Sequence, residues 1–241
     1  MNILCVIPSR IGSTRLVRKP LLPIQGKPMI QWVVEHAQQC PLFNDVVVAT
    51  DSEEIADVVH AVGGKTILTD PHIQTGSDRI AAVAKHYPHA DVVVNLQGDE
   101  PFIQASMLET LLAPFIAGET LDMATLACPL SDDDAHEPGV VKVITDLNND
   151  AIYFSRAPIP YFRSDFKPAP VHHHLGIYAF RRDFLLQYTQ LPQTPLEKIE
   201  SLEQLRAIEH GYKIRVCLTP HRTLEINTLE EWERAQKFKI N

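Results

Sequence analysis

A cluster of basic residues near the amino end of the chain is the first candidate for a functional site. The chain carries a formal net charge of -8, yet the ten residues 10–19 include four cations. These cations are Arg10, Arg15, Arg18 and Lys19. Guanidinium forks and a lysine ammonium suit the oxygens of a polyphosphate chain. The basic loop of residues 9–20, which also holds hydroxyl groups and a glycine, therefore predicts a phosphate-binding site.

An acidic segment follows a later apolar run. Asp99 and Glu100 come just after residues 91–96, which have the composition of a buried strand. Ligands of open α/β sheets bind outside the carboxyl ends of the strands, so Asp99 is expected to face the basic loop. Carboxylate oxygens opposite a triphosphate are suited to Mg²⁺. The alternative is that both acids simply lie in the first turn of a helix.

The elements that position these segments alternate along the first half of the chain. Apolar runs predict strands at residues 3–7, 46–49, 65–68 and 91–96, and helical periodicity predicts helices at 28–39, 53–62, 76–87 and 105–116. Residues 50–53 have the pattern of a capping box. The second half predicts a hairpin at 140–145 and 151–154, strands at 175–180 and 213–218, and helices at 196–209 and 229–237. We expect one α/β domain over residues 1–241, with a mostly parallel open sheet and a small inserted lobe at about 132–180.

Composition excludes several classes of protein. The negative net charge argues against a nucleic-acid partner. Because no apolar run approaches about 20 residues, membrane insertion is not expected. The four cysteines are scattered without a C-x-x-C pair, which favours structural thiols in a reducing cytoplasm. Neither the G-x-G-x-x-G nor the Walker A spacing is present, which weighs against dinucleotide oxidoreductases and P-loop NTPases.

A set of short segments follows in order along the chain. They are Ile7-Pro8-Ser9-Arg10, Ser13-Thr14-Arg15-Leu16, Lys19-Pro20-Leu21, Gly26-Lys27-Pro28-Met29-Ile30, Ala49-Thr50-Asp51, Gly76-Ser77-Asp78-Arg79, Gln97-Gly98-Asp99-Glu100-Pro101, Tyr153-Phe154-Ser155-Arg156, His174-Leu175-Gly176-Ile177-Tyr178 and Leu202-Glu203-Gln204-Leu205-Arg206. In this combination the chain resembles the CMP-Kdo synthetases, which are 3-deoxy-manno-octulosonate cytidylyltransferases. The resemblance spans nearly the whole chain.

The resemblance implies a nucleotide-diphospho-sugar transferase fold and a cytoplasmic, homodimeric enzyme. Such an enzyme joins CTP to 3-deoxy-manno-octulosonate (Kdo) with Mg²⁺, and it releases pyrophosphate and CMP-Kdo for lipopolysaccharide biosynthesis. The residues implied on the nucleotide side are Pro8, Ser9, Arg10, Arg15, Lys19, Gly76, Ser77 and Arg79. Those implied around the sugar acid are Gln97, Arg156, His174, Tyr178, Glu203 and Gln204. The implied catalytic set is Arg10, Lys19 and Asp99, with Asp99 as the magnesium ligand.

Two positions depart from the family pattern. Val17-Arg18 replaces a Pro-Gly pair, which removes the residue best suited to a positive φ. Asn227 stands where the family has a second metal-binding aspartate, and a neutral amide oxygen is a weaker partner for a hard dication. Residues 225 and 227 share one face of an extended segment. We therefore expect Glu225 to supply the missing carboxylate, with Asn227 assisting.

Alternatives to the Kdo reaction stay open at this point. The acceptor could be a modified Kdo, such as an 8-amino form, or another sugar acid. The two departures also allow a weakened paralogue that only binds nucleotide or sugar. The run of three histidines at 172–174 could suggest zinc, but consecutive strand residues alternate faces, so His174 alone is favoured, as a sugar contact.

Overall fold

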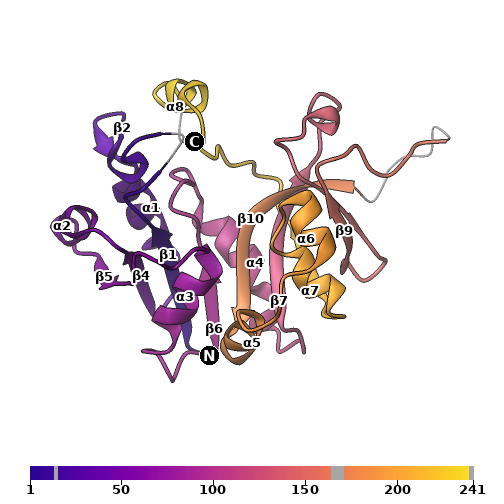
Figure 1. Cartoon of the computed structure of the whole chain (residues 1–241), viewed down its shortest axis with the longest axis horizontal. Coiled ribbons are helices and arrows are strands. Elements are labelled where there is room, and N and C mark those ends of the chain that lie inside the picture. The colour runs from indigo at the N-terminus through magenta and orange to yellow at the C-terminus, as the bar shows by residue number, and fades with distance from the viewer. Residues whose placement is uncertain (14–15, 164–170, 239–241) are drawn as a thin grey trace. The chain divides into compact units, whose positions relative to one another are not determined.

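The computed structural model describes residues 1–13, 16–163 and 171–238 (Figure 1). The chain divides into two compact units, Met1–Glu109 with Thr223–Asn241, and Thr110–Arg222. The lobe expected at 132–180 falls within the second unit, and its boundaries stay a prediction. Arg15 lies outside the described residues, so its implied contact with the nucleotide also stays a prediction.

The first unit contains a parallel sheet with the strand order β6-β1-β4-β5. These strands are β1 (Ile3–Ser9), β4 (Asp45–Thr50), β5 (Lys65–Leu68) and β6 (Val92–Asn95). The helices are α1 (Met29–Ala37), α2 (Glu53–Ala61) and α3 (Gly76–Ala84), and the chain leaves the unit within α4 (Ala105–Ile116). β1 is almost entirely buried, as a continuous apolar run in a parallel sheet should be. The α/β prediction is confirmed.

The parallel register brings the functional loops to one edge. Val6 is opposite Asn95, and Ser9 is opposite Thr50, so the segments that follow β1, β4 and β6 leave the sheet at the same edge. The capping box predicted at residues 50–53 is wrong. Ser52 is the N-cap of α2, and its N–H donates to Thr50 Oγ1 at 3.2 Å.

The carboxyl-terminal segment returns to the first unit. Ile226 and Ala235 pack in a buried cluster with Ile24, Met29 and Phe102. The segment includes the last helix, α8 (Leu229–Ala235), and the cluster lies beside the short pair β2 (Pro23–Ile24) and β3 (Lys27–Pro28). Burial of these apolar side chains is what brings the segment back. It returns residues 225–227 to the loop that contains Asp99.

The second unit has a mixed sheet around a strand that sequence analysis missed. β7 (Met123–Pro129) pairs in parallel with β11 (Ile214–Leu218) and antiparallel with β10 (Val171–Arg181). The predicted hairpin is confirmed as β8 (Lys142–Thr145) and β9 (Ala151–Ser155). The remaining elements are the helices α5 (Arg182–Tyr188), α6 (Pro195–Glu200) and α7 (Leu205–Glu209), with single 3₁₀ turns at Asp134–His136 and, in the first unit, at Lys19–Leu21.

The single helix predicted over residues 196–209 is wrong. Ser201 takes a φ of 53° and separates α6 from α7, which leaves Ile199 exposed at 77%. A buried ion pair between Glu197 and Arg206 joins the two short helices, with Arg206 Nε to Glu197 Oε2 at 2.9 Å. Because this pair needs both helices to fold toward each other, the chain turns sharply between them.

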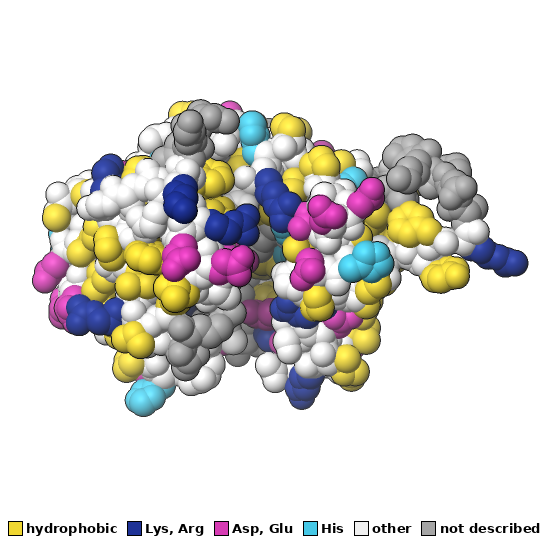
Figure 2. Space-filling view, turned by 90° about the horizontal axis from the view of Figure 1, so that it is seen from above, with side chains coloured by type: hydrophobic (Ala, Val, Ile, Leu, Met, Phe, Trp, Pro, Cys, Tyr) yellow, Lys and Arg dark blue, Asp and Glu magenta, His cyan; other side chains and the backbone are white. Residues whose placement is uncertain are grey.

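The surface of the described residues carries charges of both signs. Figure 2 shows basic and acidic side chains next to one another on one face, with hydrophobic side chains between them. Ion pairs such as Lys27–Glu35, at 2.7 Å, join some of these residues. Within the described part of the chain, no helix has the length and apolar character needed to cross a membrane.

Candidate functional site

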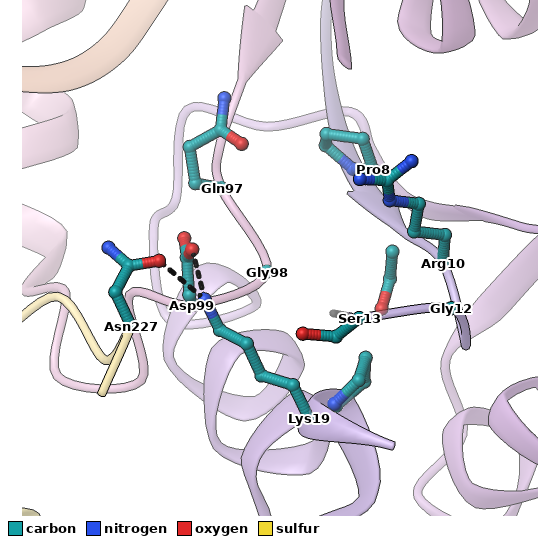
Figure 3. Close-up of a pocket in the computed structure, with 11 residues that line it drawn as sticks. Pro8, Arg10, Gly12, Ser13, Lys19, Gln97, Gly98, Asp99 and Asn227 are labelled. Carbon is teal, nitrogen blue, oxygen red and sulfur yellow. Dashed lines mark hydrogen bonds and ion pairs between the residues drawn. The ribbon is translucent and has the colours of Figure 1, made fainter. Parts of the chain in front are cut away.

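A cavity of about 270 Å³ lies in the first unit, where β1 and β6 end (Figure 3). Its lining consists of Pro8, Ser9, Arg10, Gly12, Ser13, Lys19, Pro20, Gln97, Gly98, Asp99 and Asn227. A second hollow of about 170 Å³ shares several of these residues. It is lined by Pro8, Ser9, Arg10, Ile73, Gln74, Thr75, Gly76, Arg79 and Gln97. The two hollows therefore adjoin, and together they give an elongated site.

Lys19 is the central charged group of the cavity. Its Nζ lies 2.7 Å from Asp99 Oδ2 and 2.9 Å from Asn227 Oδ1 (Figure 3). The Lys19 and Asp99 side chains are only 14% and 20% exposed, so their attraction is less screened than in a surface pair. The structure thus joins the basic loop to the acidic segment, as expected from the order of the strands.

Arg10 lies across the cavity from Asp99 and Asn227. In Figure 3 Arg10 and Ser13 lie on one side, and Asp99 and Asn227 lie on the other. The loop that carries Arg10 is fixed by Asp51, whose Oδ1 accepts from the Ile11 backbone N–H at 3.0 Å. Two cations, one carboxylate and one amide oxygen thus line the same cavity, an arrangement suited to a polyphosphate with a bound metal ion.

Arg18 takes the conformation that a glycine would take more easily. Its φ is 54° and its ψ is 35°, in the left-handed region, and it precedes the 3₁₀ turn that contains Lys19. The side chain pairs with Glu54 at the surface. The loop therefore keeps a left-handed turn without glycine, at a conformational cost of about 1–2 kcal/mol.

Replacement of Arg18 by glycine is expected to stabilise the protein. The left-handed strain disappears, while glycine adds entropy to the unfolded chain, so Arg18→Gly should raise the free energy of unfolding by roughly 0.5–1 kcal/mol. Chemical denaturation measures this change. Arg18→Ala is the matched control, because it loses the same ion pair but keeps a Cβ. Equal stability of the two variants would show that φ does not limit stability here.

The two strand ends approach closely at Gly98. A Cβ on Gly98 would lie 3.1 Å from the carbonyl oxygen of Pro8 and 3.6 Å from Ser9 Oγ. Within the described residues, Ser9 Oγ and Asp99 Oδ1 are buried and lack a hydrogen-bond partner. Buried polar atoms are normally satisfied, so these two oxygens are suited to contacts that a ligand or ion would complete.

The alternative role of Asp99 and Glu100 as acids of a helix terminus is not supported. α4 begins at Ala105, and its first turn contains no acidic residue. Glu100 is 3% exposed, and burial, together with nearby Glu225 and Asp99, raises its pKa well above the usual range. Asp99 alone of the two lines the cavity.

The amino end of α3 borders the second hollow. Thr75 caps this helix, its Oγ1 accepting from the Asp78 N–H at 3.0 Å, and both Thr75 and Gly76 line the hollow. Backbone N–H groups at a helix start favour anions. Arg79 is 3% exposed, and burial lowers its pKa. Its Nη2 donates to the Ile73 carbonyl at 3.3 Å, so Arg79 also fixes the loop before α3.

Not every residue implied on the nucleotide side or as a metal ligand lines these hollows. Ser77 and Glu225 are absent from the linings of both. Glu225 instead accepts a hydrogen bond from Asn227 Nδ2. Among the described residues, no three His, Cys, Asp or Glu side chains form a metal-ligand group. A metal ion in the cavity would therefore depend on Asp99, an amide oxygen and the ligand's own oxygens.

The second unit carries the other residues implied around the sugar acid. His174 Nε2 lies 3.0 Å from Thr125 Oγ1, and the Thr125 hydroxyl lies 2.9 Å from the carbonyl of Ile177. Because Thr125 donates its proton to a carbonyl, it accepts from His174, which places the histidine proton on Nε2. His174 Nδ1 is then an acceptor. The ring of Tyr178 is 5.5 Å away between centroids.

Stability should fall in acid because His174 is held neutral. Burial lowers its pKa from 6.5 to about 3. Between these values the unfolded state binds more protons, so stability rises with pH there and is lost as pH falls through that window. His174→Gln should reduce the slope of unfolding free energy against pH by at most about 1.4 kcal/mol per pH unit. Denaturation at several pH values from 4 to 7 tests this, and an unchanged slope would contradict it.

Arg156 is held by Glu200 through both its side chain and its backbone N–H. Its Nε donates to the Glu200 carbonyl at 2.9 Å, and its backbone N–H donates to Glu200 Oε2 at 3.0 Å. The fully buried Lys142 donates from Nζ to the Arg156 carbonyl at 2.6 Å and to the carbonyls of Glu137 and Val140. Arg156 is thus fixed by a network of buried and half-buried groups.

Glu203 and Gln204 lie between α6 and α7. The Tyr188 hydroxyl donates to the Glu203 carbonyl at 2.7 Å, and the Arg206 guanidinium lies over the Tyr188 ring. Gln204 is 4% exposed, and its buried Nε2 has no hydrogen-bond partner among the described residues. The Gln204 side-chain amide, at the break between α6 and α7, therefore offers a hydrogen-bond donor to a ligand.

Several lining residues had no role in the sequence analysis. They are Gly12, Ser13, Pro20, Gly98, Ile73, Gln74 and Thr75. For Ser13 and Gly98 the signal was available, since both lie inside the two segments that predicted the site. The segment before Gly76 carried no such pattern, and only the folded chain brings it to Pro8 and Gln97.

Comparison with known proteins gives close matches over the whole chain. A family model described as cytidylyltransferase matches residues 4–214. The 3-deoxy-manno-octulosonate cytidylyltransferase of Acaryochloris marina is 54% identical over 240 residues, which are 99% of this chain and 97% of that protein. The enzyme of the same name from Synechococcus elongatus is 46% identical, over 99% and 98% of the two chains.

Solved structures agree with these matches. A CMP:2-keto-3-deoxy-manno-octonic acid synthetase complexed with CTP superposes with a TM-score of 0.93 at 44% identity, and 98% of each chain is covered. A 4-diphosphocytidyl-2C-methyl-D-erythritol synthase from Anaerococcus prevotii has a TM-score of 0.65 at 14% identity, over 98% and 97% of the chains. This second likeness concerns the fold alone.

Proposed function

Because the chain belongs to the 3-deoxy-manno-octulosonate cytidylyltransferase family, we propose that it transfers the cytidylyl group of CTP to Kdo. The products are CMP-Kdo and pyrophosphate. The observation that carries the proposal is the cavity at the ends of β1 and β6, where Arg10, Lys19 and Asp99 enclose one space. Its charges suit the triphosphate of the nucleotide.

Charge stabilisation is the main task of the cavity residues. In this reaction the anomeric hydroxyl of Kdo attacks the α-phosphorus of CTP, and the bond to pyrophosphate breaks. Negative charge then moves toward the leaving group, and preorganised cations lower the barrier. Arg10 and Lys19 supply this positive field, and the loop contact from Asp51 holds Arg10 in place.

Binding and orientation are divided among the other implied residues. Pro8, Ser9, Gly76 and Arg79 border the second hollow and would contact the nucleotide. For the sugar acid, His174 offers an acceptor at Nδ1, and Arg156 offers a guanidinium that matches a carboxylate. Gln97, Tyr178, Glu203 and Gln204 are proposed to complete the sugar contacts. Holding both substrates in line supplies much of the rate.

The residues of the cavity fit a magnesium ion. Asp99 Oδ1 is a buried oxygen without a partner among the described residues, and Asn227 Oδ1 points toward the same Lys19. Oxygen donors are the ligands that Mg²⁺ prefers, and it commonly binds through one or two protein groups plus substrate phosphates. Asp99 and Asn227 would hold it. The chemistry that it supplies when bound is neutralisation of charge on the triphosphate.

The cellular setting is part of the same proposal. We place the enzyme in the cytoplasm, as a homodimer that makes the activated sugar for lipopolysaccharide. The four cysteines are buried and free, which suits a reducing compartment. The formal net charge of -8 is the reason that no nucleic-acid partner is proposed. Light scattering after size-exclusion chromatography measures the dimer directly.

Pyrophosphate release tests the reaction. Purified protein with CTP and Mg²⁺ should release pyrophosphate when Kdo is added, and not without it. Parallel reactions with 8-amino-Kdo and with a nine-carbon sugar acid identify the preferred acceptor through kcat/KM. Binding of CTP without turnover on any of these acids would contradict the proposal and favour a weakened paralogue.

A further inference from the structure

The side-chain amide of Asn227 has one defined orientation. Its Nδ2 donates to Glu225 Oε1, and its Oδ1 accepts from Lys19 Nζ at 2.9 Å. A carboxylate can only accept, and an ammonium can only donate. The two neighbours therefore agree on the same orientation, in which the oxygen of Asn227 faces the cavity and the nitrogen faces away from Lys19.

The backbone holds Glu225 and Asn227 on the same side. Ile226, between them, is buried in the apolar cluster of the first unit, and its N–H donates to the Asp99 carbonyl at 3.1 Å. The N–H of Asn227 donates to Glu231 Oε2 at 2.6 Å, at the start of α8. The backbone N–H groups of Ile226 and Asn227 are thus both held by hydrogen bonds, next to the contact between the Glu225 and Asn227 side chains.

We propose that Glu225 is a positioning residue that keeps the Asn227 oxygen turned toward the metal ion bound with CTP. The inference rests on the proposed function, and it differs from the sequence expectation that Glu225 is itself a ligand. Glu225 lines neither hollow, whereas Asn227 lines the cavity.

The contact between residues 225 and 227 needs an acceptor at one position and a donor at the other. A carboxylate at position 227 would meet the Glu225 carboxylate at hydrogen-bond distance, and two like charges that close oppose each other. An amide at position 225 would no longer define which end of Asn227 faces Lys19, because an amide both donates and accepts. Changing both residues together restores a donor–acceptor pair, with the charge moved to position 227.

The experiment compares a single and a double variant by metal binding. Calorimetry measures Mn²⁺ binding in the presence of CTP and without a sugar acid, so no turnover occurs. Glu225→Gln is expected to weaken Mn²⁺ binding about tenfold, a common effect of losing a group that orients a metal ligand. Glu225→Gln with Asn227→Asp should restore wild-type affinity or exceed it. Glu233→Gln, an exposed change on α8, is the matched control and should leave binding unchanged.

Thermal unfolding without metal gives a second readout. Asn227→Asp alone should lower the melting temperature, because two carboxylates then face each other, and the double variant should recover it. An unchanged Mn²⁺ affinity in Glu225→Gln overturns the inference. So does a double variant that stays as weak as Glu225→Gln, since the orientation of residue 227 would then not explain the loss.

Failure of the inference and failure of the proposed function give different results. If the unaltered protein binds no CTP with Mn²⁺, the proposed function fails, whatever the variants do. If it binds CTP and releases pyrophosphate normally while Glu225→Gln behaves like Glu233→Gln, only the role of Glu225 fails.

Discussion

Lys19→Met is expected to lower kcat for pyrophosphate release by about 10²–10³-fold, because it removes a cation from the site where charge develops. The variant keeps the length of the side chain and loses only the ammonium. Steady-state rates at saturating CTP and sugar acid measure the effect. Lys27→Met is the matched control, since Lys27 pairs with Glu35 in the same unit and does not line the cavity.

The same variant should bind divalent metal more tightly when no nucleotide is present. In the structure, Lys19 Nζ donates hydrogen bonds to Asp99 Oδ2 and Asn227 Oδ1, two oxygens of the residues proposed to hold magnesium. A dication must compete with this ammonium, so its removal frees both oxygens. Calorimetry with Mn²⁺ alone tests this. Weaker Mn²⁺ binding in Lys19→Met would show that the lysine and the metal do not share these oxygens.

Asp99→Asn should also lower kcat by about 10²–10³-fold, but its effect on metal binding should be the opposite of that of Lys19→Met. Among the described residues, Asp99 supplies the carboxylate that lines the cavity, so its loss weakens Mn²⁺ binding, and the rate recovers partly at high Mg²⁺. Pyrophosphate release over a range of Mg²⁺ concentrations measures both effects.

A control at the other end of the same strand tests whether Asp99 acts through its position. Asp91 precedes β6, and its Oδ2 accepts from the Asn2 N–H at 2.6 Å, at the edge of the sheet away from the cavity. Asp91→Asn should leave both the rate and the Mg²⁺ dependence as they are. If Asp99→Asn behaves in the same way as Asp91→Asn, the proposed metal site is wrong.

Local chemistry allowed much of the first unit to be predicted. Continuous apolar runs predict buried parallel strands, which is why β1, β4 and β6 were found. Their carboxyl ends share one edge in any parallel sheet, so Lys19 and Asp99 could be expected in one crevice. β7 was missed although it is buried along most of its length, because its small residues and Thr125 lack a clear strand pattern.

The break in the predicted helix at 196–209 shows a different limit. The apolar spacing there favours one helix, but the buried pair of Glu197 and Arg206 outweighs that preference, and Ser201 accepts a positive φ. Such a pair forms only when the chain has folded back on itself. Periodicity along the sequence carries no information about it.

By itself, the sequence determined the fold class, the family and the meeting of cations with a carboxylate at one edge of a parallel sheet. Only the tertiary structure decided that Asn227 lines the cavity and that Glu225, outside its lining, contacts the Asn227 amide. The physical reason is distance along the chain: Asn227 reaches Lys19 through the burial of Ile226 and Ala235 among residues about two hundred positions earlier, such as Ile24 and Met29. The direction of the Asn227 amide is then set by Lys19 together with Glu225, and the contact with Lys19 exists only in the folded chain.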